Sequence, residues 1–256
     1  MPKEKRHRKV IDVPELRVNE LNRGVAETST LIECFSVDFA TLMKIALPEI
    51  GGSAIEILEN AREEGILKRM RLAGGLILDR LGVGALPKLM NHPSDSVRGW
   101  ACFLIGAREY AEAMDLLSAI RPLADDHHFG VREWAWIAVR PHLAIDIEAY
   151  ITHLTSWAKS PSERVRRFSS ESTRPRGVWS AHIDTLKKHP EIGLPVLNCL
   201  RSDSARYVQL SVGNWLNDAC KYQPDWVREL CQRWLTEEPN NPHTKRIVNR
   251  ALRSLK

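Results

Sequence analysis

The sequence of 256 residues predicts an all-α fold built from repeated pairs of helices. One observation behind this prediction is a repeat, because four segments resemble one another and a fifth, "EEPNNPHTKRIVNRALRSL", follows their pattern weakly. The aligned valines of the four are Val97, Val131, Val165 and Val208, spaced 34, 34 and 43 residues apart. The other observation is that alternating apolar and polar runs, the pattern of strands, are nearly absent. Self-similarity at such a period is typical of helical solenoids.

Each repeat has the features of a helix pair. The four segments are "HPSDSVRGWACFLIG", "DDHHFGVREWAWIAV", "SPSERVRRFSSESTR" and "RSDSARYVQLSVGNW". Ser94, Ser162 and Ser204, or an aspartate beside them, can accept hydrogen bonds from the free N–H groups of a helix start. The valine then begins an apolar stripe at helical spacing, and a preceding helix ends near each cap. Because one pair cannot bury its apolar face alone, we expect a HEAT-like solenoid with a concave face.

The same patterns predict how the chain is divided. Residues 1–10 are basic and are expected to form a disordered tail, which either touches phosphates or only aids solubility. Residues 11–256 are predicted to be one domain, because no linker rich in Pro, Gly or Ser interrupts them. Within it, residues 11–84 form a helical cap and residues 85–256 form the repeats.

Composition excludes several classes of protein. The net charge of +5 permits nucleic-acid binding without requiring it. Five widely spaced cysteines without a C-x-x-C pair argue against a disulfide framework and a zinc ribbon. No apolar run of signal-peptide or membrane-spanning length occurs, so a cytoplasmic protein is expected. Phosphate-loop, dinucleotide and nucleophile-elbow motifs are missing, and we expect no cofactor and no metal.

Arginines mark the starts of the repeated helices. Arg98, Arg132 and Arg166 follow the valine in three repeats, and Arg206 lies just before it in the fourth. A cation in the first turn is unfavourable for the helix dipole. These arginines therefore either form a row that binds anions, or pair with neighbouring acids and hold the stack together.

One segment combines chemically distinct side chains. "VRRFSSESTRPRGVW", residues 165–179, resembles the motif V-R-R-x-x-S-E-G-T-R-P-R-x-x-W of the AlkC branch of the AlkC/AlkD superfamily, bacterial DNA alkylation-repair glycosylases with HEAT-like repeats. "SVGNWLNDACKYQPDWV", residues 211–227, is similar to a second motif of that branch, and "FGVREWAWIAVRPHL", residues 129–143, is similar to a third. The similarity extends over roughly residues 85–235.

The resemblance implies an activity and the residues that carry it. The family excises cationic alkylpurines, chiefly 3-methyladenine and 7-methylguanine, by cleaving the N-glycosidic bond. Glu171 and Asp218 match motif carboxylates and are the predicted catalytic residues, whereas Trp179 matches an aromatic that would contact the base or sugar. The alternatives are a surface pair of Glu171 with Arg174, a structural pair of Asp218 with an arginine of the preceding repeat, and a core position for Trp179.

The predicted DNA contacts and the remaining alternatives complete the interpretation. His128 stands where the family has an acidic residue and is assigned to substrate binding, so Asp125, Asp126 or Glu133 would have to supply the missing charge. The residues predicted to bind DNA are Arg132, Arg166, Arg167, Arg174, Arg176 and Arg206. Double-stranded DNA, alkylated or distorted, is the predicted partner, and the oligomeric state stays open. A repeat protein that binds damaged or branched DNA without excision, and a protein–protein scaffold, are the two alternatives.

Overall fold

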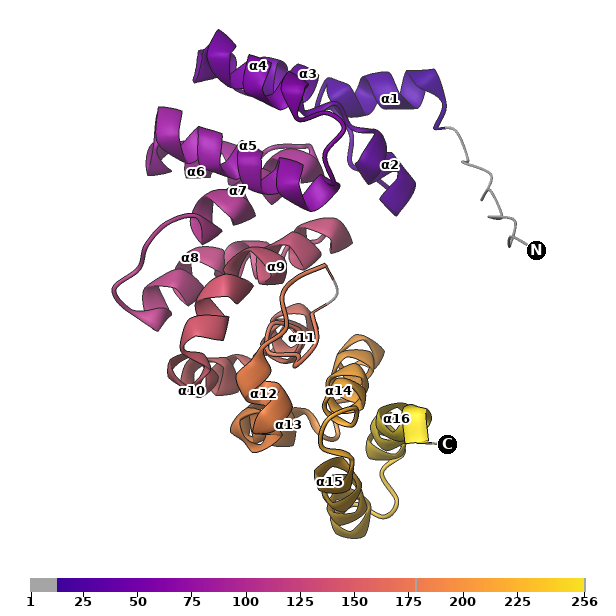
Figure 1. Cartoon of the computed structure of the whole chain (residues 1–256). Coiled ribbons are helices and arrows are strands. Elements are labelled where there is room, and N and C mark those ends of the chain that lie inside the picture. Colours follow the sequence, from indigo (N-terminus) through magenta and orange to yellow (C-terminus); the bar gives the residue numbers. More distant parts are fainter. Residues whose placement is uncertain (1–12, 178, 256) are drawn as a thin grey trace, which may run out of the picture. The chain divides into compact units, whose positions relative to one another are not determined.

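The computed structural model describes residues 13–177 and 179–255, and within those ranges every regular element is an α-helix or a short 3-10 helix (Figure 1). The all-α prediction is therefore confirmed. The tail predicted over residues 1–10 lies outside the described residues. Contacts divide the chain into two compact units, Met1–Trp100 and Ala101–Lys256, and the boundary falls inside helix α7 (Asp95–Gly106). Whether the two form one domain stays a prediction.

The unit Met1–Trp100 consists of short helices around a small apolar core. Its elements are α1 (Glu15–Asn22), α2 (Leu31–Ser36), α3 (Phe39–Ala46), η1 (Pro48–Ile50), α4 (Gly52–Asn60), α5 (Ile66–Leu81), η2 (Val83–Ala85), α6 (Leu86–Met90) and the start of α7. Leu42, Met43 and Trp100 are fully buried in it. Side chains of Thr30 and Asp38 accept hydrogen bonds at the starts of α2 and α3, so local capping fixes where these helices begin.

The unit Ala101–Lys256 holds most of the repeats, in two layers. Its elements after α7 are α8 (Ala113–Ala124), α9 (Phe129–Ile145), α10 (Ile147–Trp157), α11 (Glu163–Glu171), α12 (Asp184–Lys188), η3 (Pro190–Gly193), α13 (Leu194–Leu200), α14 (Arg206–Ala219), α15 (Pro224–Glu237), α16 (Pro242–Ala251) and η4 (Leu252–Leu255). Helices α9, α11, α14 and α16 are successive neighbours in one layer (Figure 1). Helices α8, α10 and α13 pack behind them.

The repeats begin their helices as the sequence predicts. The four aligned valines are 0–1% exposed, in α7, α9, α11 and α14. Ser162 caps α11, because its hydroxyl accepts a hydrogen bond from the N–H of Arg164 at 3.3 Å. At α14 no side chain caps the helix, because the N-cap position is Ala205; Asp203 Oδ1 accepts from the N–H of Ala205 at 2.8 Å, just before the helix begins. The expected cap is therefore present at Ser162, whereas at α14 the aspartate orders the turn that leads into the helix.

The residue after each valine makes the same contact in all four repeats. It reaches back and donates hydrogen bonds to the two carbonyl oxygens six and five positions earlier, at 2.8–3.2 Å. The acceptors are His92 and Pro93 for Arg98, Asp126 and His127 for Arg132, Ser160 and Pro161 for Arg166, and Asp203 and Ser204 for Gln209. We call this contact the loop clasp. It ties the turn between two helices to the start of the second helix, a structural task.

Three further findings limit the chemistry of the chain. None of the helices in the described part combines the length and the apolar character that crossing a membrane requires. No group of three or more His, Cys, Asp or Glu side chains within residues 13–177 and 179–255 is placed to hold a metal ion. Burial raises the pKa of the Cys34 and Cys231 thiols to about 12, so these two cysteines act as small apolar core residues.

Candidate active site

Helix α11 ends at Glu171, four residues before Pro175. Hydroxyl groups account for the early end. Ser169 donates to the carbonyl of Arg166 at 2.7 Å, and Thr173 donates to the carbonyl of Ser169 at 3.0 Å. Side chains that bond nearby carbonyls compete with the helical hydrogen-bond ladder. The chain therefore leaves the helix directly after Glu171, which places this carboxylate at a helix terminus.

Arg140 of α9 holds the loop that follows. Arg140 is 2% exposed, and its guanidinium donates to the carbonyl oxygens of Ser172 at 2.8 Å, Ala181 at 3.0 Å and Arg174. Burial lowers the pKa of Arg140 to about 10, so the group still carries its charge at neutral pH. A Cβ at Gly177 would lie 2.9 Å from Arg140 Nε, which explains the glycine. Arg140 thus fixes the path of the loop from both ends.

Glu171 is buried and fully engaged by the protein. Its Oε1 accepts a hydrogen bond from Arg174 at 2.6 Å, and its Oε2 accepts one from the Ser211 hydroxyl at 2.6 Å. Arg167 Nη2 lies 3.7 Å from Oε2. Burial by itself raises the pKa of Glu171, but the charges of Arg167 and Arg174 and the hydrogen bonds outweigh it, and the pKa falls below its ordinary value. Glu171 is therefore a desolvated anion at neutral pH.

Arg174 joins the two carboxylates that the motifs single out. Its Nε and Nη2 donate to Asp218 Oδ2 at 2.9 and 2.6 Å, while its Nη1 serves Glu171. Asp218 also has Lys221 Nζ at 3.3 Å and does not line the pocket described next. The pairs of Glu171 and of Asp218 with Arg174, expected as alternatives, are both present, but they are buried rather than on the surface. Asp218 acts on the pocket through Arg174.

A pocket of about 320 Å³ opens over Glu171. Its size is at the lower end of the roughly 300–1,000 Å³ of small-molecule sites. Two carboxylates line it, Glu133 and Glu171, with three guanidiniums, those of Arg167, Arg174 and Arg250. Side chains from α9, α11, α14 and α16 all contribute, so the pocket exists only because the repeats stack.

Glu133 supplies the second carboxylate. Its Oε1 lies 2.8 Å from Arg167 Nη2, and its Oε2 accepts a hydrogen bond from the Trp136 indole at 2.8 Å. Glu133 and Trp136 are three residues apart on α9 and so share one face of the helix. The sequence suggested Glu133 only as a substitute for the missing acid at position 128. The spacing of three residues between Glu133 and Trp136 is the sequence feature from which their shared place at the pocket could have been inferred.

Aromatic side chains complete the pocket. Trp179 lines it, is 52% exposed and adopts a left-handed φ of +67°, which non-glycine residues rarely do. Such a residue persists where its surroundings hold it, and functional sites are common places for it. Tyr207 lies under the Arg167 guanidinium, 4.3 Å from the ring centre, and its hydroxyl accepts a hydrogen bond from Arg132 at 3.1 Å. The predicted indole is therefore at the pocket, on the loop held by Arg140.

The six arginines predicted to bind DNA fall into two groups. Four make contacts inside the protein, namely Arg132 with Tyr207, Arg166 with Asp203 at 2.6 Å, Arg167 with Glu133, and Arg174 with Glu171 and Asp218. Arg176 and Arg206 have no carboxylate partner among residues 13–177 and 179–255. Four of the six arginines therefore make contacts that hold neighbouring helices together.

His128 has a capping role instead of a place in the pocket. It is 7% exposed, its Nδ1 accepts a hydrogen bond from the N–H of Gly130 at 3.2 Å, and its ring packs on Phe129 with centroids 4.7 Å apart. It is not among the residues that line the pocket. The expected substrate contact at His128 is replaced by a helix N-cap at the start of α9.

Comparisons with known proteins agree with this architecture. A family of HEAT repeats matches residues 84–173. The structure of Pseudomonas fluorescens alkylpurine DNA glycosylase AlkC, bound to DNA containing an abasic site analogue, is similar over 95% of this chain and 65% of that one, with a TM-score of 0.69 and 25% identity. The structure of smu.31 from Streptococcus mutans UA159 is similar in fold over 78% of this chain and 96% of that one, with a TM-score of 0.59 and 20% identity.

A curated relative shares more sequence over a shorter stretch. The uncharacterized protein YhaZ of Bacillus subtilis (strain 168) is 41% identical over 118 residues, which are 46% of this chain and 32% of YhaZ. The chain therefore spans about a third of YhaZ and 65% of AlkC. The HEAT-repeat match and the similarity in fold to AlkC together support an AlkC/AlkD-like HEAT-repeat architecture for this chain.

Proposed function

We propose that this protein is a DNA glycosylase that hydrolyses the N-glycosidic bond of cationic alkylpurines, 3-methyladenine and 7-methylguanine, in double-stranded DNA. The observation that carries the proposal is Glu171, a buried carboxylate kept ionised by two arginines at the wall of a pocket. The similarity in fold to an alkylpurine glycosylase bound to DNA supports both the reaction class and the partner.

The chemistry needs an anion rather than an acid. An N-alkylated purine is already cationic, so the C1′–N bond can break with both electrons leaving on the base, without protonation by the enzyme. The sugar then carries positive charge in an oxocarbenium-like transition state, until a water oxygen bonds to C1′ and the proton of that water passes to solvent. A fixed carboxylate in a desolvated site stabilises that charge. Glu171 fits this role because its pKa lies below the ordinary value.

Glu133 fits the second role in this reaction. Its carboxylate also lines the pocket and comes from a different repeat, so the two acids approach a ligand from α9 and α11. Glu133 supplies a negative charge to the pocket, which His128 does not line. One carboxylate can stabilise the sugar while the other orients the attacking water.

The mixture of charges matches an alkylated nucleotide. Such a ligand carries a negative phosphate and a positive base, and the pocket offers three guanidiniums and two carboxylates. The exposed indole of Trp179 adds a face on which a cationic base or a deoxyribose can pack.

The test is release of free base from methylated duplex DNA by the wild type, Glu171→Gln and Glu163→Gln. Glu163 is the matched control, because it lies exposed in the first turn of the same helix. We expect Glu171→Gln to lower the rate at least about 10²-fold, the size of effect known for a lost electrostatic stabiliser. Duplex binding should persist in both variants. Release that survives in Glu171→Gln would refute the assignment.

A second candidate is a protein that binds damaged or branched DNA without excising a base. It is favoured by one observation, that both oxygens of Glu171 already accept hydrogen bonds from Arg174 and Ser211. In that case neither the wild type nor Glu171→Gln releases base, while salt-sensitive duplex binding is the same in both. The experiment above separates the two candidates.

A further inference from the structure

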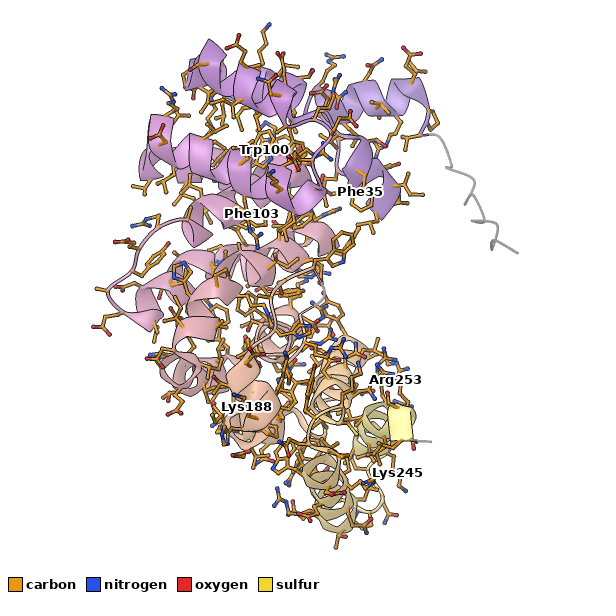
Figure 2. The ribbon with its side chains drawn as sticks, in the orientation of Figure 1. Phe35, Trp100, Phe103, Lys188, Lys245 and Arg253 are labelled. Carbon is orange, nitrogen blue, oxygen red and sulfur yellow. The ribbon has the colours of Figure 1, made fainter. Side chains whose placement is uncertain are left out.

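The last helix of the chain is basic on one side. Residues 242–255, which form α16 and η4, contain four basic residues and no acidic residue. Arg246, Arg250 and Arg253 are spaced by four and three positions, so they follow one face of the helix. We call these three the α16 arginine stripe. Figure 2 labels Arg253, which lies in η4 directly after α16.

The stripe runs along the edge of the pocket. Arg250 lines the pocket, and its Nε donates a hydrogen bond to Asn214 Oδ1 at 2.8 Å. Its aliphatic stem lies across Gly213, where a Cβ would come within 2.8 Å of Arg250 Cβ and 3.0 Å of Cγ and Cδ. Arg253 Nη1 donates to the carbonyl of Arg250 at 2.9 Å. The glycine thus lets α16 approach α14 closely enough to bring the stripe to the pocket.

Arg206 faces the stripe from α14. It is exposed and begins α14, two turns before Gly213 and on the same helical face as the pocket residues Leu210 and Asn214. After burial, the charges of Arg253, Arg206 and Arg174 are the causes that lower the pKa of Arg250, so these cations lie within electrostatic range of one another. They form a cluster from two adjacent helices.

Little of the charge of this cluster is balanced by the described carboxylates, since Glu171 acts on Arg250 only at a distance and is itself paired with Arg174. Within residues 13–177 and 179–255, no carboxylate forms an ion pair with Arg206, Arg246, Arg250 or Arg253. Like charges four residues apart weaken a helix, and a cation in the first turn of α14 opposes the helix dipole. The mutual repulsion of these cations is therefore not relieved by an ion pair within the described residues. A bound anion would relieve it.

We propose that the α16 arginine stripe, together with Arg206, is a phosphate-binding site that holds the DNA backbone beside the pocket. The inference rests on the proposed function and names the part of the substrate that these residues recognise. It also changes the assignment made from sequence, since Arg132, Arg166, Arg167 and Arg174 are engaged inside the protein. Arginines hold phosphates through paired, directed N–H groups, and such contacts position the duplex.

The experiment measures binding of the full chain to a short unmodified DNA duplex over a range of salt concentrations. The variants are the triple substitution Arg246→Gln/Arg250→Gln/Arg253→Gln and the single substitution Arg250→Lys, which keeps the charge. Arg233→Gln is the matched control, because Arg233 is exposed on α15 and its loss changes the net charge equally per site. Thermal melting checks that every variant is folded.

Each phosphate contact that is lost lowers the slope of log K against log salt by about 0.9. We expect the triple variant to lose roughly 2–3 units of slope, Arg250→Lys to keep the wild-type slope, and Arg233→Gln to match the wild type. A triple variant that binds DNA like the wild type refutes the assignment of the α16 arginine stripe to phosphate binding and leaves the glycosylase proposal intact. Wild-type binding that does not vary with salt overturns both proposals. Salt-dependent binding through the α16 arginine stripe without any release of base supports the phosphate-binding assignment and refutes the glycosylase activity.

Discussion

At the scale of single residues, Arg140 and Arg174 organise the site more than the carboxylates do. Arg140 donates to three carbonyl oxygens at both ends of the loop after α11, which carries Trp179. Arg174 lies within that loop and joins Glu171 to Asp218. Buried carbonyls and carboxylates without donors are costly, so each guanidinium satisfies several groups at once. These contacts hold the loop and both carboxylates without a bound ligand.

The pKa of Glu171 gives a prediction about stability and pH. Because this pKa is lower in the folded protein than its ordinary value of 4.5, ionised Glu171 stabilises the fold above pH 4.5. The contribution is lost as the pH falls through the folded-state pKa. We expect the difference in unfolding free energy between the wild type and Glu171→Gln to be largest near neutral pH and to shrink below about pH 4.5. Urea denaturation across this range measures it, and a difference that grows toward acid pH would contradict the prediction.

At the scale of elements, the loop clasp explains why a residue of this kind follows each valine. Arg166 donates to two loop carbonyls and also pairs with Asp203, which begins the next repeat. Gln209 makes the carbonyl contacts with an uncharged amide. The carbonyl contacts therefore need only a donor of sufficient length, whereas the pair with Asp203 needs a charge.

Substitutions at Arg166 can separate these two contributions. Arg166→Ala removes the donor of both carbonyls and the ion pair with Asp203, which keeps its hydrogen bond from Ala205, and should lower the unfolding free energy by about 2–3 kcal/mol. Arg166→Gln should behave as Gln209 does, keeping the carbonyl contacts and costing only about 1 kcal/mol for the lost ion pair. Urea denaturation measures both, and equal losses for the two variants would mean that the clasp contributes nothing. Neither variant should change the salt slope of duplex binding, because Arg166 is not among the unpaired arginines.

How much the sequence predicts also depends on the element. The valines that begin the apolar faces of the repeated helices and the cap at Ser162 were predictable, because both act locally, whereas the cap of α9 by His128 was not predicted. Glu171 and Trp179 were found through the motif that contains them. Glu133 and Arg250 lie in other repeats, and their distance from Glu171 is set by how the helices stack. Local patterns do not carry that distance, so the pocket and the stripe required the structure.

At the scale of the whole molecule, the open question is whether Met1–Trp100 and Ala101–Lys256 fold together. The boundary falls inside α7, so the chain crosses it as helix rather than as a linker. In repeat proteins each repeat is stabilised by its neighbours, which couples the folding of adjacent parts. The prediction of one domain over residues 11–256 therefore requires one cooperative unfolding transition.

The positions of the tryptophans make this prediction measurable. Seven of the eight lie in Ala101–Lys256, and the eighth is Trp100, the last residue of the other unit. Indole fluorescence thus reports mainly on Ala101–Lys256, whereas circular dichroism at helical wavelengths reports on both units. If the chain is one domain, the two signals will follow the same urea transition with the same midpoint, as two-state unfolding demands. A dichroism transition without a counterpart in fluorescence would show that Met1–Trp100 unfolds alone, and residues 11–84 would then be a separate domain instead of a cap.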